Sequence, residues 1–513
     1  MKKSIAVFIT TILIIISGKS LSNPVFNFVD SGDDEVSKAV LFVSDVNNLN
    51  GKALELNTAS DGRLASLLSL NSFTPSEGEL LHLQMLGDIS DVLVIGVNND
   101  KPLTGPALQD IGGKIAGAFK SASNDVTATI FVENLQADMS IAAAHIAYGY
   151  HLRHYSFDKY KTKKDNGVSS INLASVSSSA NEAVYQNDLQ FIAQGVHLAR
   201  DLASEPGKSI YPQSFVDKVV ALFKGVDNVN IDVLDVRDME KNNMGALLGV
   251  GQGSIHEPRM LVIEYMGGNK GDAPIALAGK GITFDTGGIS LKGNTNMWMM
   301  KSDLSGAAAV AGTLHAVAQR GEKVNLIGLM PLAENMPAED AIRPGDVLQT
   351  MQGTSIEIIS TDAEGRLILA DAVYYAQQKY MPKMLLNIAT LTGSAARAMS
   401  DEYGAVITRD MPLSLEMMEV GKKSGEHVWP LPLHPNHFIQ IESDIADIKN
   451  SGAGDPGASI AAAVIGTFIN EDLPWIHLDI AGVDWLSADA DTVPKGSQGW
   501  GVRFMDQVVR DNK

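Results

Sequence analysis

The eight residues 360–367, which read STDAEGRL, constrain the fold of this chain more than any other stretch. Before them, Ile356 and Ile358 alternate with polar residues over 354–359, as in a β-strand. After them, residues 367–378 carry apolar side chains at helical spacing. The octet is therefore expected at the carboxyl end of a strand, which is where open α/β sheets place their ligand sites.

Charged side chains occupy alternate positions of the octet, at Asp362, Glu364 and Arg366. Alternate side chains of an extended segment lie on one side of it, so both carboxylates can converge on a divalent cation. A charged helix N-terminus is the plainer alternative, because Asp and Glu are favoured there without any ligand. A second polar cluster upstream favours the metal site.

That second cluster lies in a Gly-rich segment, residues 278–309, and its charged members are Lys280, Asp285, Lys292 and Asp303. Each of them alone is typical of a surface residue. Together with the octet, they would bring four carboxylates to two strand ends of one sheet. Four carboxylates can neutralise two divalent cations about 3.5 to 4 Å apart, which polarise a substrate oxygen and generate hydroxide near neutral pH.

Several other kinds of site are disfavoured. The chain has no Cys, which excludes disulfides, thiolate metal sites and a Cys nucleophile. The H-E-x-x-H motif of zinc proteases is absent, and so is the G-x-S-x-G elbow of serine hydrolases. The net charge of −20 and the pI near 4.9 argue against binding to nucleic acid or to an anionic membrane, and are typical of a soluble protein.

The N-terminus has the three parts of a secretory signal peptide. Two lysines precede an apolar run, 5–16, and residues 18–22 supply small side chains where signal peptidase prefers them. We therefore predict a signal peptide over residues 1–22, cleaved after about Ser22. The mature protein would be secreted or periplasmic rather than cytoplasmic, without stable membrane association. An uncleaved anchor is the alternative, although the run is short for a membrane span.

The length of 513 residues predicts two domains after the signal peptide. We place an N-terminal α/β domain at 23–168, a polar linker region at 169–180 and a larger domain at 181–513. Strands alternate with helices, which predicts an α/β fold whose larger, catalytic domain has a mixed central sheet covered by helices on both faces. The expected strands are 39–43, 91–97, 126–132, 229–234, 260–265, 275–277, 324–329, 384–389 and 475–480. The expected helices are 105–120, 137–154, 181–202, 304–319 and 457–469.

These motifs resemble those of a known family, the leucyl aminopeptidases of the cytosol aminopeptidase type. The signature N-T-D-A-E-G-R-L of that family appears here as STDAEGRL. The similarity extends through the second domain, in MGALLGVGQGS, the block 280–303, LAENMP, RPGDV, ATLTGS, SDIADIKN, HLDIAG and PKGSQGWGVRF. In the first domain it is one of general layout. The resemblance implies a small α/β domain before a larger catalytic one, assembled as a homohexamer of two trimers.

The resemblance also implies a set of metal ligands. Two divalent ions per subunit, Zn²⁺ or Mn²⁺, would be held by Lys280, Asp285, Asp303, Asp362 and Glu364. Asp285 and Glu364 would bridge the two ions. Lys280 and Asp303 would complete one site, and Asp362 would complete the other with its side chain and its backbone carbonyl. Carboxylate-rich sites of this kind accept Zn, Mn, Co or Mg by availability.

Two further residues would be catalytic by the same resemblance, Lys292 and Arg366. Arg366 would hold a bicarbonate that acts as general base. The pocket for the first side chain of the substrate would be lined by Met300, Thr390, Leu391, Gly393 and Ala481.

We therefore expect a dinuclear aminopeptidase that removes the N-terminal residue, leucine-like by preference, from peptides by means of metal-activated water. A catalytically inactive family member that acts as a binding or scaffold protein is the alternative. The retained charge cluster disfavours it, because a scaffold has no need of so costly a cluster. Ser360 replaces the usual Asn of the signature, and Trp298 stands where a charged residue is common. We expect the change at Ser360 to alter the pocket wall and the side-chain preference, and Trp298 lies close to the pocket position Met300.

Overall fold

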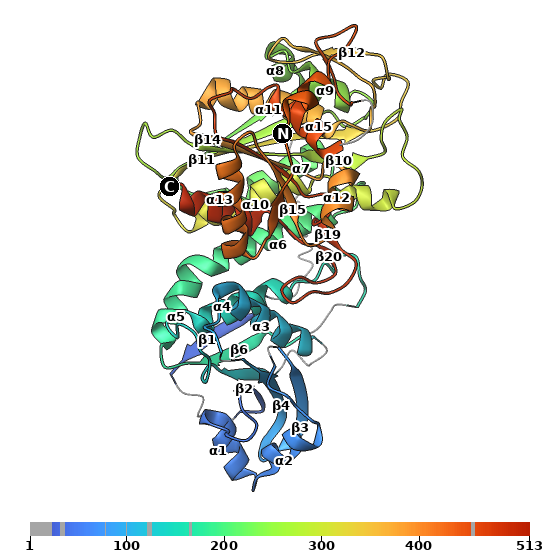
Figure 1. Cartoon of the computed structure of the whole chain (residues 1–513). Coiled ribbons are helices and arrows are strands. Elements are labelled where there is room, and N and C mark those ends of the chain that lie inside the picture. The colour runs from blue at the N-terminus through green and yellow to red at the C-terminus, as the bar shows by residue number, and fades with distance from the viewer. Residues whose placement is uncertain are drawn as a thin grey trace, which may run out of the picture.

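The structure of the chain is a computed structural model that describes residues 23–30, 36–76, 78–98, 100–120, 126–163, 167–452 and 457–513. The predicted signal peptide lies outside these ranges. Within them, no helix is both long and apolar enough to cross a membrane. The chain forms two α/β bodies, a smaller N-terminal one drawn in blue to teal and a larger one drawn in green to red in Figure 1.

The N-terminal body is built on a six-stranded sheet. Its strand order is β1 (Val25–Val29), β6 (Ser170–Ala174), β5 (Thr127–Phe131), β2 (Lys38–Val43), β4 (Ile89–Gly96) and β3 (Leu80–Leu86). Neighbouring strands are parallel except β4 and β3. The helices are α1 (Gly51–Ala59), α2 (Arg63–Leu70), α3 (Gly105–Ala118) and α4 (Ala142–Arg153). Along β2, Val40 and Phe42 pack with α3 and α4, whereas Leu41 and Val43 pack with α1 and α2, so helices cover both faces.

The segment predicted as a linker, 169–180, begins with a strand. Residues 170–174 form β6, which pairs with β1 and β5, because Ile171 and Leu173 are fully buried in that sheet. The chain then continues as one helical run through α5 (Ser178–Val184), the π-helical turn η1 (Tyr185–Leu189) and α6 (Gln190–Ser204). A helix rather than an extended linker therefore leads from one body to the other (Figure 1).

The larger body contains a nine-stranded mixed sheet. Its order is β16 (Val428–Pro430), β15 (Gly404–Ile407), β18 (Trp475–Asp479), β14 (Met384–Ala389), β9 (Ile275–Gly279), β11 (Asn325–Asn335), β8 (Arg259–Met266) and β7 (Val229–Leu234), with β10 (Gly281–Asp285) paired to β11. The central strands β18, β14, β9 and β11 are parallel. β8 and β7 extend one side of the sheet with antiparallel pairing, and β15 is antiparallel to β18.

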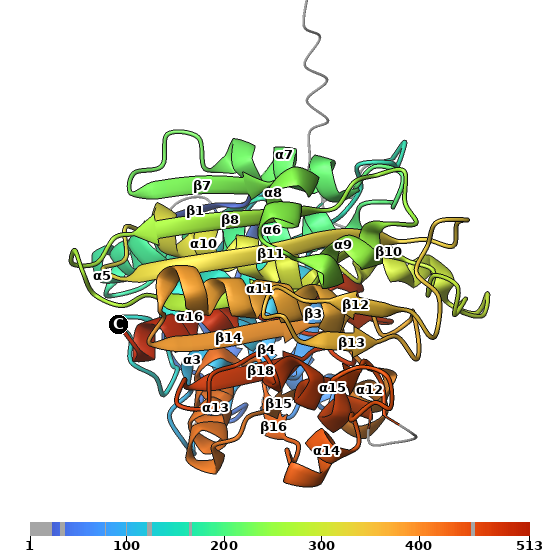
Figure 2. The same cartoon turned by 90° about the horizontal axis from the view of Figure 1, so that it is seen from above.

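Helices cover both faces of this sheet, as the two sides of β9 show. Ile275 and Leu277 pack on one face and Ala276 and Ala278 on the other, all of them fully buried. The first face carries α6, α7 (Pro212–Leu222), α10 (Ser305–Gln319), α13 (Met411–Ser424) and α16 (Val502–Asp511). The second carries α8 (Val236–Lys241), α9 (Gly245–Gly251), α11 (Gly365–Tyr380) and α15 (Gly457–Gly466). Figure 2 shows the sheet from above. The predicted fold class is confirmed.

Two small sheets and three short helical elements complete the larger body. One sheet joins β12 (Val347–Gln349), β13 (Ser355–Glu357) and β17 (Ile448–Lys449), and the other joins β19 (Trp485–Leu486) and β20 (Gly496–Ser497). The short helices are η2 (Met297–Ser302), α12 (Gly393–Met399) and α14 (Pro435–Ile439). β13 precedes the octet, so the expectation that both clusters follow strands of one sheet is wrong. β13 pairs instead with its neighbour in sequence, β12, in a local antiparallel ribbon.

Candidate metal centre

Asp285 ends β10 and is followed by a turn that glycine makes without strain. Gly287 and Gly288 have φ angles of +88° and +64°, which other residues rarely adopt. A Cβ at Gly288 would lie 2.8 Å from Asn335 Oδ1, so there is no room for a side chain. The segment after this turn brings the Lys292 ammonium to Asp285, with 2.7 Å between Nζ and Oδ2.

The octet forms a turn rather than an extended segment. The prediction that its alternate charged side chains lie on one side is therefore wrong. Residues 361 and 362 lie in the turn, and Glu364 already has helical backbone angles, φ −82° and ψ −34°, directly before α11. Arg366 lies inside α11, where successive side chains rotate by about 100°. Asp362 and Glu364 consequently line a common pocket, whereas Arg366 does not.

Asn335 and Thr361 hold these two segments together. Asn335 is the last residue of β11, and its side-chain amide donates to Asp285 Oδ1 at 2.8 Å and to Thr361 O at 3.0 Å. The Thr361 hydroxyl donates to Gly287 O at 2.6 Å. Neither residue was identified from the sequence as part of a site. The signal that could have found Asn335 is a polar residue at the end of a long apolar strand, inside the LAENMP motif.

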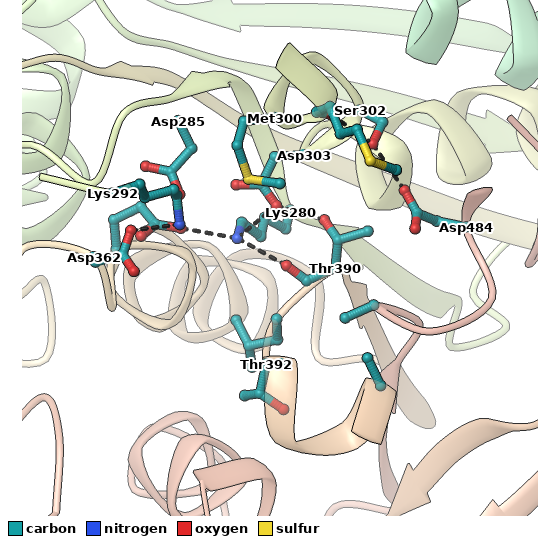
Figure 3. Close-up of a pocket in the computed structure, with 16 residues that line it drawn as sticks. Lys280, Asp285, Lys292, Met300, Ser302, Asp303, Asp362, Thr390, Thr392 and Asp484 are labelled. Atoms are coloured by element: carbon teal, nitrogen blue, oxygen red, sulfur yellow. Dashed lines mark hydrogen bonds and ion pairs between the residues drawn. The ribbon is translucent and has the colours of Figure 1, made fainter. Parts of the chain in front are cut away.

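The structure brings the five predicted metal ligands together. Asp285, Asp303 and Glu364 each offer a carboxylate oxygen, and these oxygens lie within 4.8 Å of one another. Lys280 Nζ lies 2.8 Å from Asp303 Oδ1 and 2.8 Å from Glu364 Oε1. Asp362 contacts Lys292 on the more exposed side of the cluster. Figure 3 shows both ammonium groups among the carboxylates.

Burial and charge act against each other in this cluster. Burial raises the pKa of Asp285 to about 6 and the pKa of Asp303 well above its ordinary value. At Glu364 burial acts in the same direction, but the charges of Lys280 and Lys292 outweigh it and hold the pKa below its ordinary value. At both lysines burial lowers the pKa, yet the surrounding carboxylates raise it overall. The carboxylates therefore favour cations at this place.

The donor set fits divalent metal ions. Asp303 Oδ2 and Glu364 Oε2 are buried and accept no hydrogen bond from any described residue. A buried polar atom without a partner is costly, and native structures contain few of them. Hard divalent cations take carboxylate oxygens as ligands, so ions at this place would satisfy both atoms.

A pocket of about 390 Å³ opens beside the cluster. Every predicted site residue except Arg366 lines it, including all five predicted to contact the first side chain of the substrate. Thr390 joins the two groups, because its carbonyl accepts from Lys280 Nζ at 2.9 Å and its hydroxyl donates to Asp303 Oδ1 at 2.6 Å. The predicted ligands and the predicted side-chain pocket are thus parts of one cavity.

Arg366 is buried behind the cluster. Its Nη1 donates to Asn450 O at 3.0 Å, while its Nε is buried and has no hydrogen-bond partner among the described residues. Burial lowers the pKa of Arg366 to about 10. The unpaired Nε is a donor of the kind that a small anion accepts from.

Five residues that line the pocket were not identified from the sequence: Met299, Ser302, Thr392, Ala396 and Asp484. Thr392 is held by Asp479, whose Oδ2 accepts from the Thr392 hydroxyl at 2.6 Å and whose Oδ1 accepts from Leu391 N at 3.1 Å. Met299 and Ser302 flank predicted residues in η2. Asp484 follows HLDIAG by two residues, and a lone acid after a strand carries no local signal of function.

Ser360 does not line the pocket, so the expectation that it changes the pocket wall is wrong. Its hydroxyl accepts from Asp362 N at 3.2 Å, which stabilises the turn. Trp298 is 58% exposed and packs edge-on against Trp485, with ring centroids 6.1 Å apart.

The predicted ligands are carboxylates and a lysine around one pocket of an α/β domain, and the set contains no His or Cys. This combination defines a metal-dependent enzyme of the carboxylate-ligated class. Comparison with known proteins identifies the family. Residues 197–505 match the cytosol aminopeptidase family, catalytic domain, and residues 40–164 match the cytosol aminopeptidase family, N-terminal domain. The chain belongs to the cytosol aminopeptidase family, and it is a metal-dependent aminopeptidase.

Individual relatives agree with this assignment. A probable cytosol aminopeptidase of Rickettsia bellii is 37% identical over 500 residues, covering 95% of this chain and 99% of the relative. One of Nitrobacter winogradskyi is 41% identical over 427 residues, covering 82% and 84%. Among solved structures, the bottromycin maturation enzyme BotP in complex with Mn is 26% identical, with a TM-score of 0.81 over 93% of this chain and 99% of that one. A mutant tomato leucine aminopeptidase shares the fold, with a TM-score of 0.84 at 24% identity, covering 97% and 100%.

Proposed function

We propose that this aminopeptidase is dinuclear, with two divalent ions held by Lys280, Asp285, Asp303, Asp362 and Glu364. The observation that carries the proposal is the convergence of three carboxylates within 4.8 Å of one another, two of them with buried oxygens that no described residue satisfies. Peptides with a free amino terminus are the substrates. When bound, two such ions supply Lewis-acid polarisation of the scissile carbonyl and an activated water.

Lys292 lines the pocket, where its ammonium could stabilise negative charge that develops on a substrate. Its side chain is 23% exposed, so the ammonium can meet a ligand in the pocket. The carboxylates of Asp285 and Asp362 hold it in position and raise its pKa, so it stays a cation at neutral pH. A fixed ammonium beside the scissile carbonyl donates to the oxygen as its charge grows.

Arg366 is proposed to hold a bicarbonate, which would supply a general base for the hydrolysis. Its support is the buried Nε that has no partner among the described residues. Protein freed of carbonate by degassing should lose activity and regain it when bicarbonate is added. Arg366→Met should remove that response, and an unchanged response in the variant would exclude this role.

The function is tested by hydrolysis of a panel of aminoacyl-p-nitroanilides, leucyl-p-nitroanilide among them. Chelator-treated protein should be inactive and should unfold at a lower temperature, and added divalent ion should restore both properties. Elemental analysis should find two ions per chain. Full activity in verifiably metal-free protein would contradict the proposal, and so would inactivity towards every substrate with metal bound.

Zn²⁺ and Mn²⁺ are the proposed native ions. Support for Mn²⁺ comes from the related enzyme BotP, which has been solved in complex with Mn. Reconstitution with each metal in turn, followed by comparison of kcat/KM, decides between them. The native ion should also be the one recovered from protein purified without added metal.

Assembly and location are proposed on sequence grounds. The family resemblance supports a homohexamer, which light scattering would show as about six times the mass of one chain. The signal-like segment at residues 1–22 supports a secreted or periplasmic enzyme. N-terminal sequencing of native protein should begin near Asn23, and recovery of Met1 from a cytosolic fraction would contradict the location.

The leucine-like preference expected from the resemblance rests on apolar pocket walls, which include Met300, Leu391 and Ala481. Leucyl peptides should therefore be accepted. The same pocket, however, contains a carboxylate that a leucine side chain leaves unpaired.

A further inference from the structure

Asp484 shares the pocket with the metal ligands but is not one of the residues proposed to bind metal. It follows Ala481 by three residues, in the connection between β18 and β19, and lines the pocket although it is only 8% exposed. In Figure 3 it lies across Thr390 from Lys292 and Asp362. Asp484 therefore lies on the side of the pocket away from Lys292 and Asp362 (Figure 3), together with residues that the sequence predicted to contact the first side chain of a substrate.

The Asp484 carboxylate has neutral partners. The hydroxyls of Ser302 and Ser305 donate to Oδ2 at 2.9 Å and 3.4 Å. Within the described ranges no side chain donates to Oδ1, and no cation forms an ion pair with Asp484. Lys301, beside Ser302, has its Nζ over the ring of Trp485, 5.3 Å from the centroid. Asp484 is thus a buried carboxyl group with no ion-pair partner among the described residues, and burial raises its pKa to about 7. A cation supplied by a ligand in the pocket would stabilise its charged form.

The remaining wall of this part of the pocket is largely apolar. Its apolar members are Met299, Met300, Leu391, Ala396 and Ala481. Lysine and arginine side chains place their methylene groups along apolar surface while their charged ends keep a polar partner. A carboxylate at the end of a specificity pocket is also the means by which trypsin selects basic residues.

We propose that Asp484 selects peptides whose N-terminal residue is lysine or arginine, by pairing with the cation at the end of that side chain. This inference rests on the proposed aminopeptidase function and names its substrate class. The methylene groups pack on the apolar wall, and the cation meets Oδ1. A leucyl side chain fits the wall but leaves the carboxylate unpaired, so leucyl substrates are hydrolysed with a lower kcat/KM.

A purely structural role for Asp484 makes a different prediction. The two serine hydroxyls come from the junction of η2 and α10, next to the ligand Asp303. If Asp484 only holds that junction, removing its charge changes the hydrolysis of all substrates by the same factor. A role in selection changes the hydrolysis of cationic substrates alone.

The test compares lysyl- with norleucyl-p-nitroanilide, because the norleucine side chain matches that of lysine without the terminal ammonium. Wild-type enzyme should favour the lysyl substrate in kcat/KM by about 10- to 150-fold, the range of one charge-assisted hydrogen bond. Asp484→Asn keeps an acceptor for the two serine hydroxyls. It should remove most of that preference by slowing lysyl hydrolysis, while norleucyl hydrolysis stays the same or rises.

Asp491→Asn is the matched control. It removes the same charge a few residues further along the chain, from a side chain that is 46% exposed and 3.7 Å from Lys114. It does not line the pocket, so it should leave the lysyl-to-norleucyl ratio unchanged. The metal content of both variants should match that of wild type, and neither variant should melt at a lower temperature than wild type.

Equal kcat/KM for the two substrates in wild type would overturn the inference, and so would an equal loss for both in Asp484→Asn. Either result leaves the aminopeptidase function standing, because hydrolysis is still observed. If no substrate is hydrolysed, the proposed function fails, and calorimetry with free L-lysine and L-norleucine decides the inference separately. Tighter binding of L-lysine that disappears in Asp484→Asn supports the cation pocket, and equal binding of the two amino acids overturns it.

Discussion

Replacing Lys280 by arginine tests whether an amine is a metal ligand in this site. Lys280 Nζ lies between Asp303, Glu364 and the carbonyl of Thr390, and the residue is 3% exposed. Coordination requires the neutral amine, yet the neighbouring carboxylates raise the pKa of Lys280 even though burial lowers it. A nearby dication would reverse that balance, because it repels the ammonium form. A guanidinium stays charged and cannot become a ligand.

The structure sets the size of the expected effect. A Cβ added at Gly365 would lie 2.6 Å from Lys280 Cδ, so the lysine stem fills its channel against the start of α11. The larger arginine should cost about 1 to 3 kcal/mol of overpacking. When the free metal concentration is 100 times the Kd of that ion, losing the ion should lower the free energy of unfolding by a further amount of about 2.7 kcal/mol. In excess chelator only the packing cost should remain between variant and wild type.

Elemental analysis of Lys280→Arg should give one ion per chain instead of two. The kcat/KM of the variant should fall by about 100-fold or more, which exceeds the usual loss of activity when a group that only supports a metal ligand is removed. Lys292→Arg is the matched comparison, since it keeps a cation at the more exposed lysine of the cluster. It should retain both ions and lose about 10- to 1,000-fold in kcat. Two ions per chain in Lys280→Arg would refute the reasoning and leave only carboxylates as ligands.

Three further changes test the packing around the metal ligands and a buried acid elsewhere in the larger body. Asn335→Ala removes the amide that orients the proposed metal ligand Asp285, and metal titration should show affinity lowered by about 10- to 100-fold. Unchanged affinity would show that this hydrogen bond does not support metal binding. Gly365→Ala should displace Lys280 and lower metal content, whereas Gly293→Ala, where a Cβ meets nothing within 4 Å, should not. Burial raises the pKa of Glu426 to about 7, so wild type should lose up to about 3 kcal/mol of unfolding free energy as pH rises from about 4.5 to 7. Glu426→Gln, in which one oxygen can still accept both backbone hydrogen bonds, should remove that loss in chemical denaturation at each pH.

The local pattern around the octet identified its chemistry but not its geometry. Alternation of Ile356 and Ile358 correctly indicated a strand, yet nothing in that run specifies which sheet it joins. That choice depends on the partner β12, which lies close in sequence. The spacing of 362, 364 and 366 implied one extended face, and the helix begins too early for that to hold. The acids still meet, because their position depends on the Asn335 and Thr361 hydrogen bonds, which tertiary structure alone creates.

The end of the pocket that carries the proposed metal ligands and the end that carries Asp484 are held by different kinds of contact. At the ligand side, a Cβ on Gly306 would lie 2.3 Å from Ile388 O, and one on Gly365 would meet Lys280, so backbone and side chains leave no space for change. At the other end, two hydroxyls hold Asp484. Exchanging an acid for an uncharged group of similar length disturbs hydroxyl contacts without moving the backbone. Asp484→Leu should therefore fold with both ions bound and favour norleucyl over lysyl substrates, and loss of metal from that variant would show that the two ends are not independent.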